Sequence, residues 1–360
     1  MSPLTTTAAL TAARPAPEAP ETTGTSGAPA RGPLAAWLLA VVVVLALVAA
    51  ASLAIGARGL ALDTVWHALV HFDPANGDHA VVQARIPRTV LGLLAGGALG
   101  LAGAAMQGVA RNPLADPGII GVNAGAALAV VTGIYVFGVS SLSGYIWFAF
   151  IGAAGAAAVV YLIASLGRDG ATPVKLALAG AALSAGLYSL MNVMLVSSQD
   201  TLDRFRFWQV GGIAGRDWSV VLPGVPFLLL GALIVLGTGR ILNGLALGDD
   251  LARGLGQRVG VARGITALGI VLLCGSATAL AGPIGFVGLV IPHAVRFLTG
   301  PDYRWILPFS LALAPALLLA ADVMGRVILL PGEVPAGIMT ALLGAPVFVW
   351  LVRRGKGAGL

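Results

Sequence analysis

The side chains that could do chemistry are few, and the sharpest of them is a carboxylate within an apolar stretch. Asp322 lies in the run ALLLAADVMGRVILL, and Arg326 follows it one helical turn later. An unpaired acid in a bilayer is costly, so we expect Asp322 and Arg326 to form a structural ion pair. A lone acid offers little of a proton relay, so ion coupling by Asp322 is the less favoured alternative.

No arrangement of catalytic residues stands out. The two lysines, Lys175 and Lys356, lie outside any Gly-Lys-Ser or Gly-Lys-Thr sequence of a phosphate-binding loop. His67 and His71 have the i, i+4 spacing of metal ligands, but a third ligand in matching register is missing. Cys274 is the single cysteine, which excludes a disulfide within the chain. We expect no catalytic residue, no metal site and no cofactor bound by this chain.

These residues must be positioned by a very apolar chain. Hydrophobic residues make up 58% of its 360 positions and charged residues 10%, whereas a soluble domain has roughly a quarter charged residues. The mean hydropathy is +0.93. A bilayer core needs about 20 apolar residues per helix, and we predict an all-α membrane protein with ten transmembrane helices near residues 34–55, 89–109, 119–137, 146–166, 176–196, 220–236, 265–281, 284–297, 306–328 and 338–352. The eighth is short and contains Pro292, so it could be tilted, broken or half-length.

The ends of the chain have a different composition from its middle. Residues 1–33 are rich in Ala, Pro and Thr and cannot bury a core, so we predict a disordered tail before a membrane domain at 34–354 and a short tail at 355–360. With the first tail inside, fourteen Lys and Arg fall inside and seven outside. The positive-inside rule then places both termini in the cytoplasm of a multi-pass plasma-membrane protein. In a membrane protein the position of the cations matters more than the net charge of +6, which therefore does not indicate nucleic-acid binding.

Small and charged residues mark particular spans. Gly92, Gly96 and Gly100 recur every four residues, a spacing that lets helix backbones approach closely. Three arginines flank the outer ends of predicted spans, where they could anchor the chain at the interface or meet the carboxylates of a partner: Arg85, Arg88 and Arg326.

The loop LALGDDLARGLG at residues 245–256 is too polar for the bilayer but favours a helix. Leu247, Leu251 and Leu255 fall four apart, which predicts a short amphipathic helix with Asp249 and Arg253 off its apolar stripe. Such a helix could lie on the membrane or insert into a groove of another protein. The residues alone do not separate these two roles.

Several long motifs resemble one family, the FecCD-type permeases of ABC importers for iron-siderophores, haem and cobalamin. The motifs are RIPR at 85–88, QGVARNPLADPGIIGVNAG at 107–125, LALGD at 245–249, GFVGLVIPH at 285–293 and LGAPVF at 343–348. The resemblance implies ten helices per subunit and a second permease subunit, identical or related. It also implies two cytoplasmic ATPases that bind ATP and magnesium, and an external substrate-binding protein.

The function implied by the resemblance is translocation of a ferric-siderophore-type chelate into the cytoplasm, driven by ATP hydrolysis in the separate ATPase. The sequence does not choose between a ferric siderophore, haem and cobalamin. The competing class is a secondary transporter driven by an ion gradient, which would be expected to carry several membrane-embedded acids.

The resemblance also implies roles for individual residues. It makes Arg85, Arg88 and Arg326 docking residues for the binding protein, and it places Thr172 and Pro173 in a cytoplasmic gate, although this turn departs from the hydroxyl-rich version of some members. Three amide side chains could border the path, namely Gln107, Asn112 and Asn123. The segment implied to couple to the ATPase contains Leu245, Gly248, Asp249, Asp250, Ala252, Arg253, Leu255 and Gly256.

Overall fold

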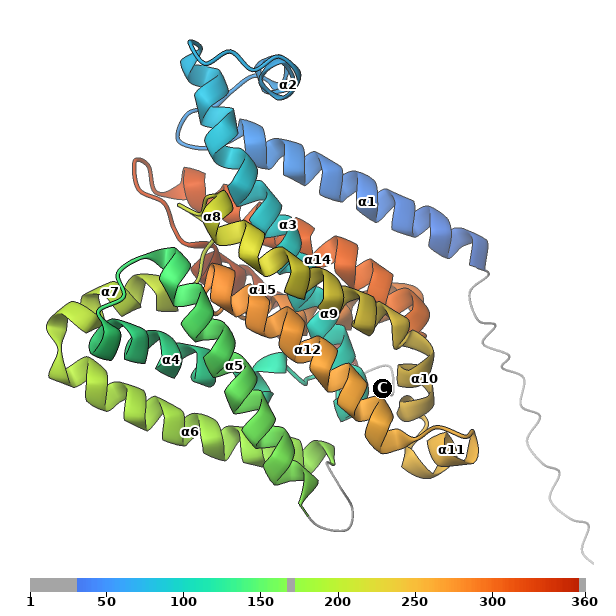
Figure 1. Ribbon diagram of the computed structural model, residues 1–360. Helices are drawn as coiled ribbons and strands as arrows, with labels where there is room; N and C mark the ends of the chain where they lie inside the picture. The colour runs from blue at the N-terminus through green and yellow to red at the C-terminus, as the bar shows by residue number, and fades with distance from the viewer. Residues whose placement is uncertain (1–30, 167–171, 356–360) are drawn as a thin grey trace, which may run out of the picture.

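The computed structural model describes residues 31–166 and 172–355, and all ten predicted spans are helices there (Figure 1). Seven are long and apolar enough to cross a membrane, counting residues 218–237 as one, and α4, α13 and α15 are shorter apolar helices. The bounds are α1 Arg31–Ala54, α3 Gly77–Ala110, α4 Val122–Phe137, α5 Leu142–Ser165, α6 Pro173–Ser197, α9 Val225–Gly237, α12 Val259–Ala281, α13 Val287–Thr299, α14 Tyr303–Ile328 and α15 Ala336–Gly355. The tails predicted at 1–33 and 355–360 lie almost entirely outside the described residues.

Short helices connect the spans at the two ends of the bundle. In Figure 1, α2 and α11 lie at opposite ends of the molecule. We refer to the end of the bundle that carries α11 as the α11 end. The bounds of these short elements are α2 Leu62–Val70, η1 Pro117–Ile120, α7 Gln199–Gln209, α8 Trp218–Val221, η2 Leu222–Gly224, α10 Gly239–Ala246 and α11 Asp249–Gly254.

Helix α3 forms the centre of the bundle, and its glycines allow the close packing that their spacing predicts. A Cβ atom at Gly96 would lie 2.5 Å from the Cα of Pro315 in α14, and one at Gly103 would lie 1.9 Å from the carbonyl oxygen of Gly288 in α13. No side chain fits at such distances. The glycines therefore let the backbone of α3 pack directly against the backbones of its neighbours. Such close packing stabilises helix association in lipid, where no hydrophobic force drives it.

The eighth span, α13, is short rather than broken. It has 13 residues and so a length of about 20 Å at 1.5 Å per residue, less than the roughly 30 Å bilayer core. Pro292 lies inside the helix without ending it. Phe286, just before the helix, has a positive φ of 68°, which marks the tight turn from which α13 starts.

The prediction of one continuous helix over residues 245–256 is wrong. Helix α10 ends at Ala246 and α11 begins at Asp249, with Leu247 and Gly248 between them. Gly248 has φ 105° and ψ 158°, a conformation that only glycine adopts without strain. The apolar period of the leucines is compatible with one helix or with two, so the pattern could not reveal the break.

Candidate functional site

Asp322 and Arg326 form the ion pair that their spacing predicts, and both are buried. Arg326 Nε donates to Asp322 Oδ2 over 2.9 Å, and Arg326 Nη2 also contacts that oxygen. Both residues lie on α14, one turn apart, so the helix itself fixes their geometry. The pair explains how a carboxylate is tolerated at this depth.

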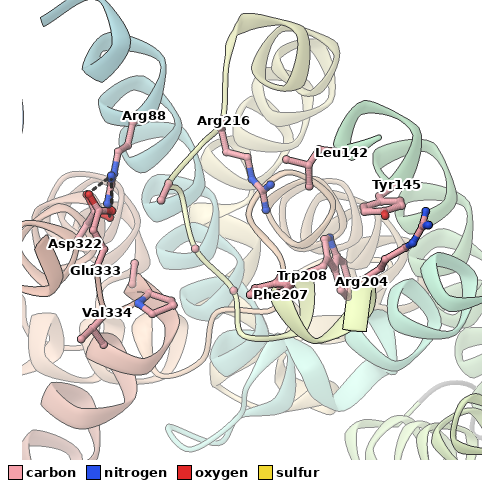
Figure 2. Close-up of a pocket in the computed structure, with 15 residues that line it drawn as sticks. Arg88, Leu142, Tyr145, Arg204, Phe207, Trp208, Arg216, Asp322, Glu333 and Val334 are labelled. Atoms are coloured by element: carbon pink, nitrogen blue, oxygen red, sulfur yellow. Dashed lines mark hydrogen bonds and ion pairs between the residues drawn. The ribbon is translucent and has the colours of Figure 1, made fainter. Parts of the chain in front are cut away.

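A second arginine reaches the same carboxylate from α3. Arg88 Nε donates to Asp322 Oδ2 over 3.0 Å and Arg88 Nη2 to Asp322 Oδ1 over 2.8 Å, as the dashed lines in Figure 2 mark. Arg88 Nη1 also lies 2.8 Å from Glu333 Oε2, in the turn between α14 and α15. We call Arg88, Asp322, Arg326 and Glu333 the arginine–carboxylate cluster. Its two cations and two anions balance.

The cluster is tied to the end of α1 by backbone carbonyls. Arg326 Nη1 donates to the carbonyl oxygens of Ser52 over 2.7 Å and Ile55 over 3.1 Å. Nearby, Arg85 Nη1 donates over 2.7 Å to the carbonyl oxygen of Leu53. The last carbonyls of a helix have no partner within the helix. Two arginines therefore satisfy the C-terminal end of α1.

This geometry bears on the docking role that the resemblance implies for three arginines. Arg326 is only 2% exposed, and its guanidinium is committed to Asp322 and α1. Arg85 and Arg88 are partly buried. The physical reason is Asp322, because its buried carboxylate needs cationic partners and draws Arg88 and Arg326 inward. Arg326 does not present a docking surface in this structure.

A cavity of about 290 Å³ opens beside the cluster. Figure 2 shows Arg216, Trp208, Tyr145 and Arg204 around it, with Arg88 and Glu333 on the opposite side. Trp208 and Arg216 are not among the site residues expected from the sequence. A usable signal was present, since residues 204–208 read RFRFW and Arg216 follows after a short loop.

At the α11 end, one carboxylate joins three elements. Asp249, the first residue of α11, accepts a hydrogen bond of 2.8 Å from Arg263 Nη2 in α12. Its Oδ1 also lies 3.4 Å from Nη1 of Arg111, which follows α3. The adjacent Asp250 points outward and pairs only within α11, with Arg253. Asp249 therefore connects α11 to the ends of α3 and α12.

The three leucines of the predicted stripe are exposed. Leu247, Leu251 and Leu255 are 58%, 61% and 68% exposed, whereas Leu245 and Ala252 are buried against the bundle. We call residues 245–256 the coupling segment. An apolar row on a short polar element indicates contact with something other than water.

A second polar connection holds α10 to the start of α14. Asn243 Nδ2 donates to Asp302 Oδ1 over 2.6 Å, and the amide of Tyr303 donates to Asn243 Oδ1 over 2.8 Å. Hydrogen bonds from Arg304, and then from Asn243, lower the pKa of Asp302 to about 2. Asp302 is thus charged at neutral pH and holds this junction.

The residues proposed to border the path or gate have local partners in the structure. Gln107 Nε2 donates to the Leu289 carbonyl of α13 over 3.2 Å, and Asn123 Oδ1 accepts from Thr278 Oγ1 of α12 over 2.9 Å. Asn112 caps its own turn by accepting from the Leu114 amide. Thr172 caps α6, whose first residue is Pro173. The structure assigns these side chains helix contacts and caps.

Metal ligands do not gather in the part of the chain that the structure describes, where no group of three or more His, Cys, Asp or Glu side chains could hold an ion. The rings of His67 and His71 are 6.4 Å apart. His79 Nδ1 instead accepts a hydrogen bond from the Asp73 amide.

Comparison with known proteins gives a consistent result. The model of the FecCD transport family matches residues 42–354. The ferric enterobactin transport system permease protein FepD of Escherichia coli (strain K12) is 48% identical over 308 residues, which cover 85% of this chain and 91% of that protein. The hemin transport system permease protein HmuU of Yersinia pestis is 36% identical over 326 residues, covering 88% and 94%.

A solved structure has the same fold. A chain from an inward-facing conformation of a metal-chelate type ABC transporter matches with a TM-score of 0.78 at 30% identity, covering 89% of this chain and 99% of that chain. The ten-helix arrangement is therefore shared with a transporter permease.

Proposed function

This chain belongs to the FecCD transport family and is a permease of the ABC importers that carry ferric chelates, and we propose that it moves a ferric-siderophore-type chelate into the cytoplasm using ATP hydrolysed by separate subunits. The relatives named for siderophore, hydroxamate and citrate transport support the ferric chelate. ATP and magnesium belong to the partner ATPases.

The observation that carries the ATP coupling is the exposed apolar row of the coupling segment. Leu247, Leu251 and Leu255 face away from the bundle, while Asp249 anchors the same segment to α3 and α12. A groove on one of the two cytoplasmic ATPases would cover the leucines of this chain. Movement of the ATPase would then reach the spans through Asp249.

The substrate-binding protein would dock at the opposite end of the bundle. Arg85 and Arg88 lie there and retain partial exposure, and Arg58 adds a cation whose side chain is 63% exposed. Exposed charge pairs contribute about 0.2 to 1 kcal/mol each, so they orient docking more than they hold it. Arg326 supports this surface from below.

A second permease subunit, identical or related, would complete the path. Only 17% of the apolar window of α6 is buried within this chain, against 83% for α3, so α6 has a face left for a partner or for lipid. Thr172 and Pro173 at the start of α6, with Gln107, Asn112 and Asn123, stay candidates for the path and its gate. Both termini would lie in the cytoplasm.

Ion-gradient coupling is the competing function, and the arginine–carboxylate cluster counts against it. Asp322 is hydrogen-bonded to both Arg88 and Arg326. Both oxygens of this carboxylate are engaged by guanidinium donors, so Asp322 serves as a structural link between α3 and α14 and not as an open ion-binding site.

Reconstitution tests the proposal directly. The chain would be placed in proteoliposomes with its ATPase and binding-protein partners, and uptake of iron-59 would be followed with ferric enterobactin, a ferric hydroxamate, ferric citrate and hemin. We expect uptake of at least one chelate that requires ATP and the binding protein. ATP-independent uptake by the chain alone would favour the ion-gradient alternative.

A further inference from the structure

The cavity beside the arginine–carboxylate cluster contains polar groups that the cluster does not use. It lies between α7, the loop that follows it, the start of α5 and residues 333–336. All of these are at the end of the bundle opposite α11. Its volume of about 290 Å³ is at the lower limit for small-molecule sites.

Arg216 lines this cavity without an ion pair to any of the described residues. Arg88 is bonded to Asp322 and Glu333, and Arg204 to Asp200. Arg216 Nε is buried and lacks a hydrogen-bond partner among the described residues. Desolvation by burial lowers the pKa of Arg216, and no nearby carboxylate raises it. A desolvated guanidinium of this kind favours an anion.

Trp208 provides a second unused donor. Its side chain is 2% exposed, and its indole Nε1 has no partner among the described residues. Figure 2 shows the indole and the Arg216 guanidinium directed into the same space, with Tyr145 and Arg204 on its far side. Buried donors are satisfied in nearly all proteins, so two donors without a protein partner beside one cavity mark a place where an acceptor could bind.

The chemistry of the missing group follows from these donors. A guanidinium offers a planar fork of N–H groups that matches a bidentate oxygen anion, and the aromatic rings provide a surface for a flat apolar group. Ferric iron is a hard cation, and its chelators hold it through pairs of oxygen atoms in carboxylate, hydroxamate or catecholate arms. A volume of about 290 Å³ is small for a ligand site, which favours one such arm over a whole siderophore.

We propose that this cavity is a binding site for one oxygen-donor arm of the ferric chelate, held by Arg216 and the indole N–H of Trp208. The inference rests on the proposed function, because the chelate must arrive at this end. The site would receive the chelate after the binding protein docks and before it enters the path. A carboxylate of the binding protein is the competing occupant, and the experiment below separates the two.

Direct binding tests the site without transport. The permease–ATPase complex, free of ATP and binding protein, would be incubated with iron-59 complexes of enterobactin, a hydroxamate, citrate and hemin, and retained iron would be measured at equilibrium. We expect at least one of the enterobactin, hydroxamate and citrate complexes to bind, and Arg216→Ala to raise its Kd at least about tenfold, as for a lost charged hydrogen bond. Retention of hemin alone would overturn the site, because its iron is held by nitrogen atoms. Arg216→Lys should retain part of the affinity. Trp208→Phe should weaken binding while keeping the aromatic surface.

Arg206→Ala is the matched control, because Arg206 belongs to the same helix as Trp208, pairs with Asp203 and does not line the cavity. Equal Kd values for Arg216→Ala and Arg206→Ala, or no retained chelate of the four, would overturn the site. Weaker docking of the binding protein to Arg216→Ala with unchanged chelate binding would assign the cavity to the competing occupant. If wild-type proteoliposomes show no ATP-driven uptake, it is the proposed function that fails.

Discussion

Burial decides how much each ion pair contributes to the stability of this molecule. Asp203 and Arg206 pair at 3.0 Å on an exposed helix, while Asp322 and Arg88 pair at 2.8 Å in the interior. The distances are similar, but water screens the first pair and its net contribution is about 0 to 1 kcal/mol. In the second pair the carboxylate of Asp322 is only 1% exposed, so water can replace a lost partner only poorly. The same kind of ion pair therefore contributes little to stability at the exposed site and much more at the buried one.

Substituting Asp322 should reveal this difference. Asp322→Asn keeps the shape but removes the charge that Arg88 and Arg326 share, and loss of one partner from a buried ionic group costs about 3 to 5 kcal/mol. We expect a clear fall in the thermal unfolding temperature of the purified protein, followed by tryptophan fluorescence. Asp203→Asn is the control and should unfold with the wild type. Equal unfolding temperatures for the two variants would show that the cluster is not a structural centre.

The sequence predicted the pair of Asp322 and Arg326 in this cluster, but not the contacts that Arg88 makes. Asp322 and Arg326 are four residues apart, so helical geometry alone brings them together. Arg88 is 234 residues from Asp322, and only the packing of α3 on α14 makes them neighbours. The docking role given to Arg326 took no account of burial. The donors Trp208 and Arg216 likewise became a site only once α7 and the following loop were placed.

At the scale of the elements, the coupling segment has two distinct surfaces. One carries the exposed leucines, and the other carries Asp249, which reaches Arg111 and Arg263. Gly248 permits the turn that separates α10 from α11 and directs Asp249 toward the bundle. An external push on the leucines can therefore reach the bundle through this carboxylate, through the buried Leu245 and Ala252, and through the backbone.

Asp249→Asn should loosen that connection. The variant loses the charge that holds Arg111 and Arg263, so α11 could move without displacing α3 and α12. In proteoliposomes containing the full complex, we expect more ATP hydrolysed per chelate transported. Asp250→Asn is the control, because Asp250 is adjacent, almost fully exposed and paired only with Arg253. An unchanged ratio of ATP to chelate in Asp249→Asn would show that coupling takes another route.

The spans were predictable because lipid imposes one requirement on all of them. An apolar run of sufficient length must be a helix in a bilayer, whatever it packs against. The break at Leu247–Gly248 lies in a water-exposed connection, where that requirement is absent and a single glycine conformation decides the course. The packing partners of Gly96 and Gly103 could not be predicted from the sequence. A small residue indicates that another backbone packs closely against it, but it does not identify that backbone.

Across the whole molecule, burial is distributed very unevenly. Within the apolar window of each span, 83% of residues are buried in α3, but only 11% in α1 and 17% in α6. The central helix is held by protein, while α1 and α6 meet lipid or another subunit. Charged contacts concentrate at the two ends, with the arginine–carboxylate cluster at one and Asp249 and Asp302 at the other.

The orientation of the bundle can be tested by labelling. Ala75→Cys lies before α3 at the proposed outer end, and Gly254→Cys lies at the end of α11. In intact cells, we expect a membrane-impermeant maleimide to label Ala75→Cys and to label Gly254→Cys only after permeabilisation. The wild type is the control, since Cys274 is buried and should not react. The reverse pattern would invert the topology and with it the assignment of both ends.

The tie between Arg88, Arg326 and the end of α1 has a mechanical consequence. It pins α1, α3 and α14 to one another at a single level, and α3 then runs 22 residues further to Ala110, about 33 Å at 1.5 Å per residue. Helix α3 also packs against α13 and α14 along this length, so a tilt about the pinned level would move these helices together, and the displacement would be greatest at the end farthest from that level. We expect the pinned level to act as the pivot and the largest excursions to occur beside the coupling segment.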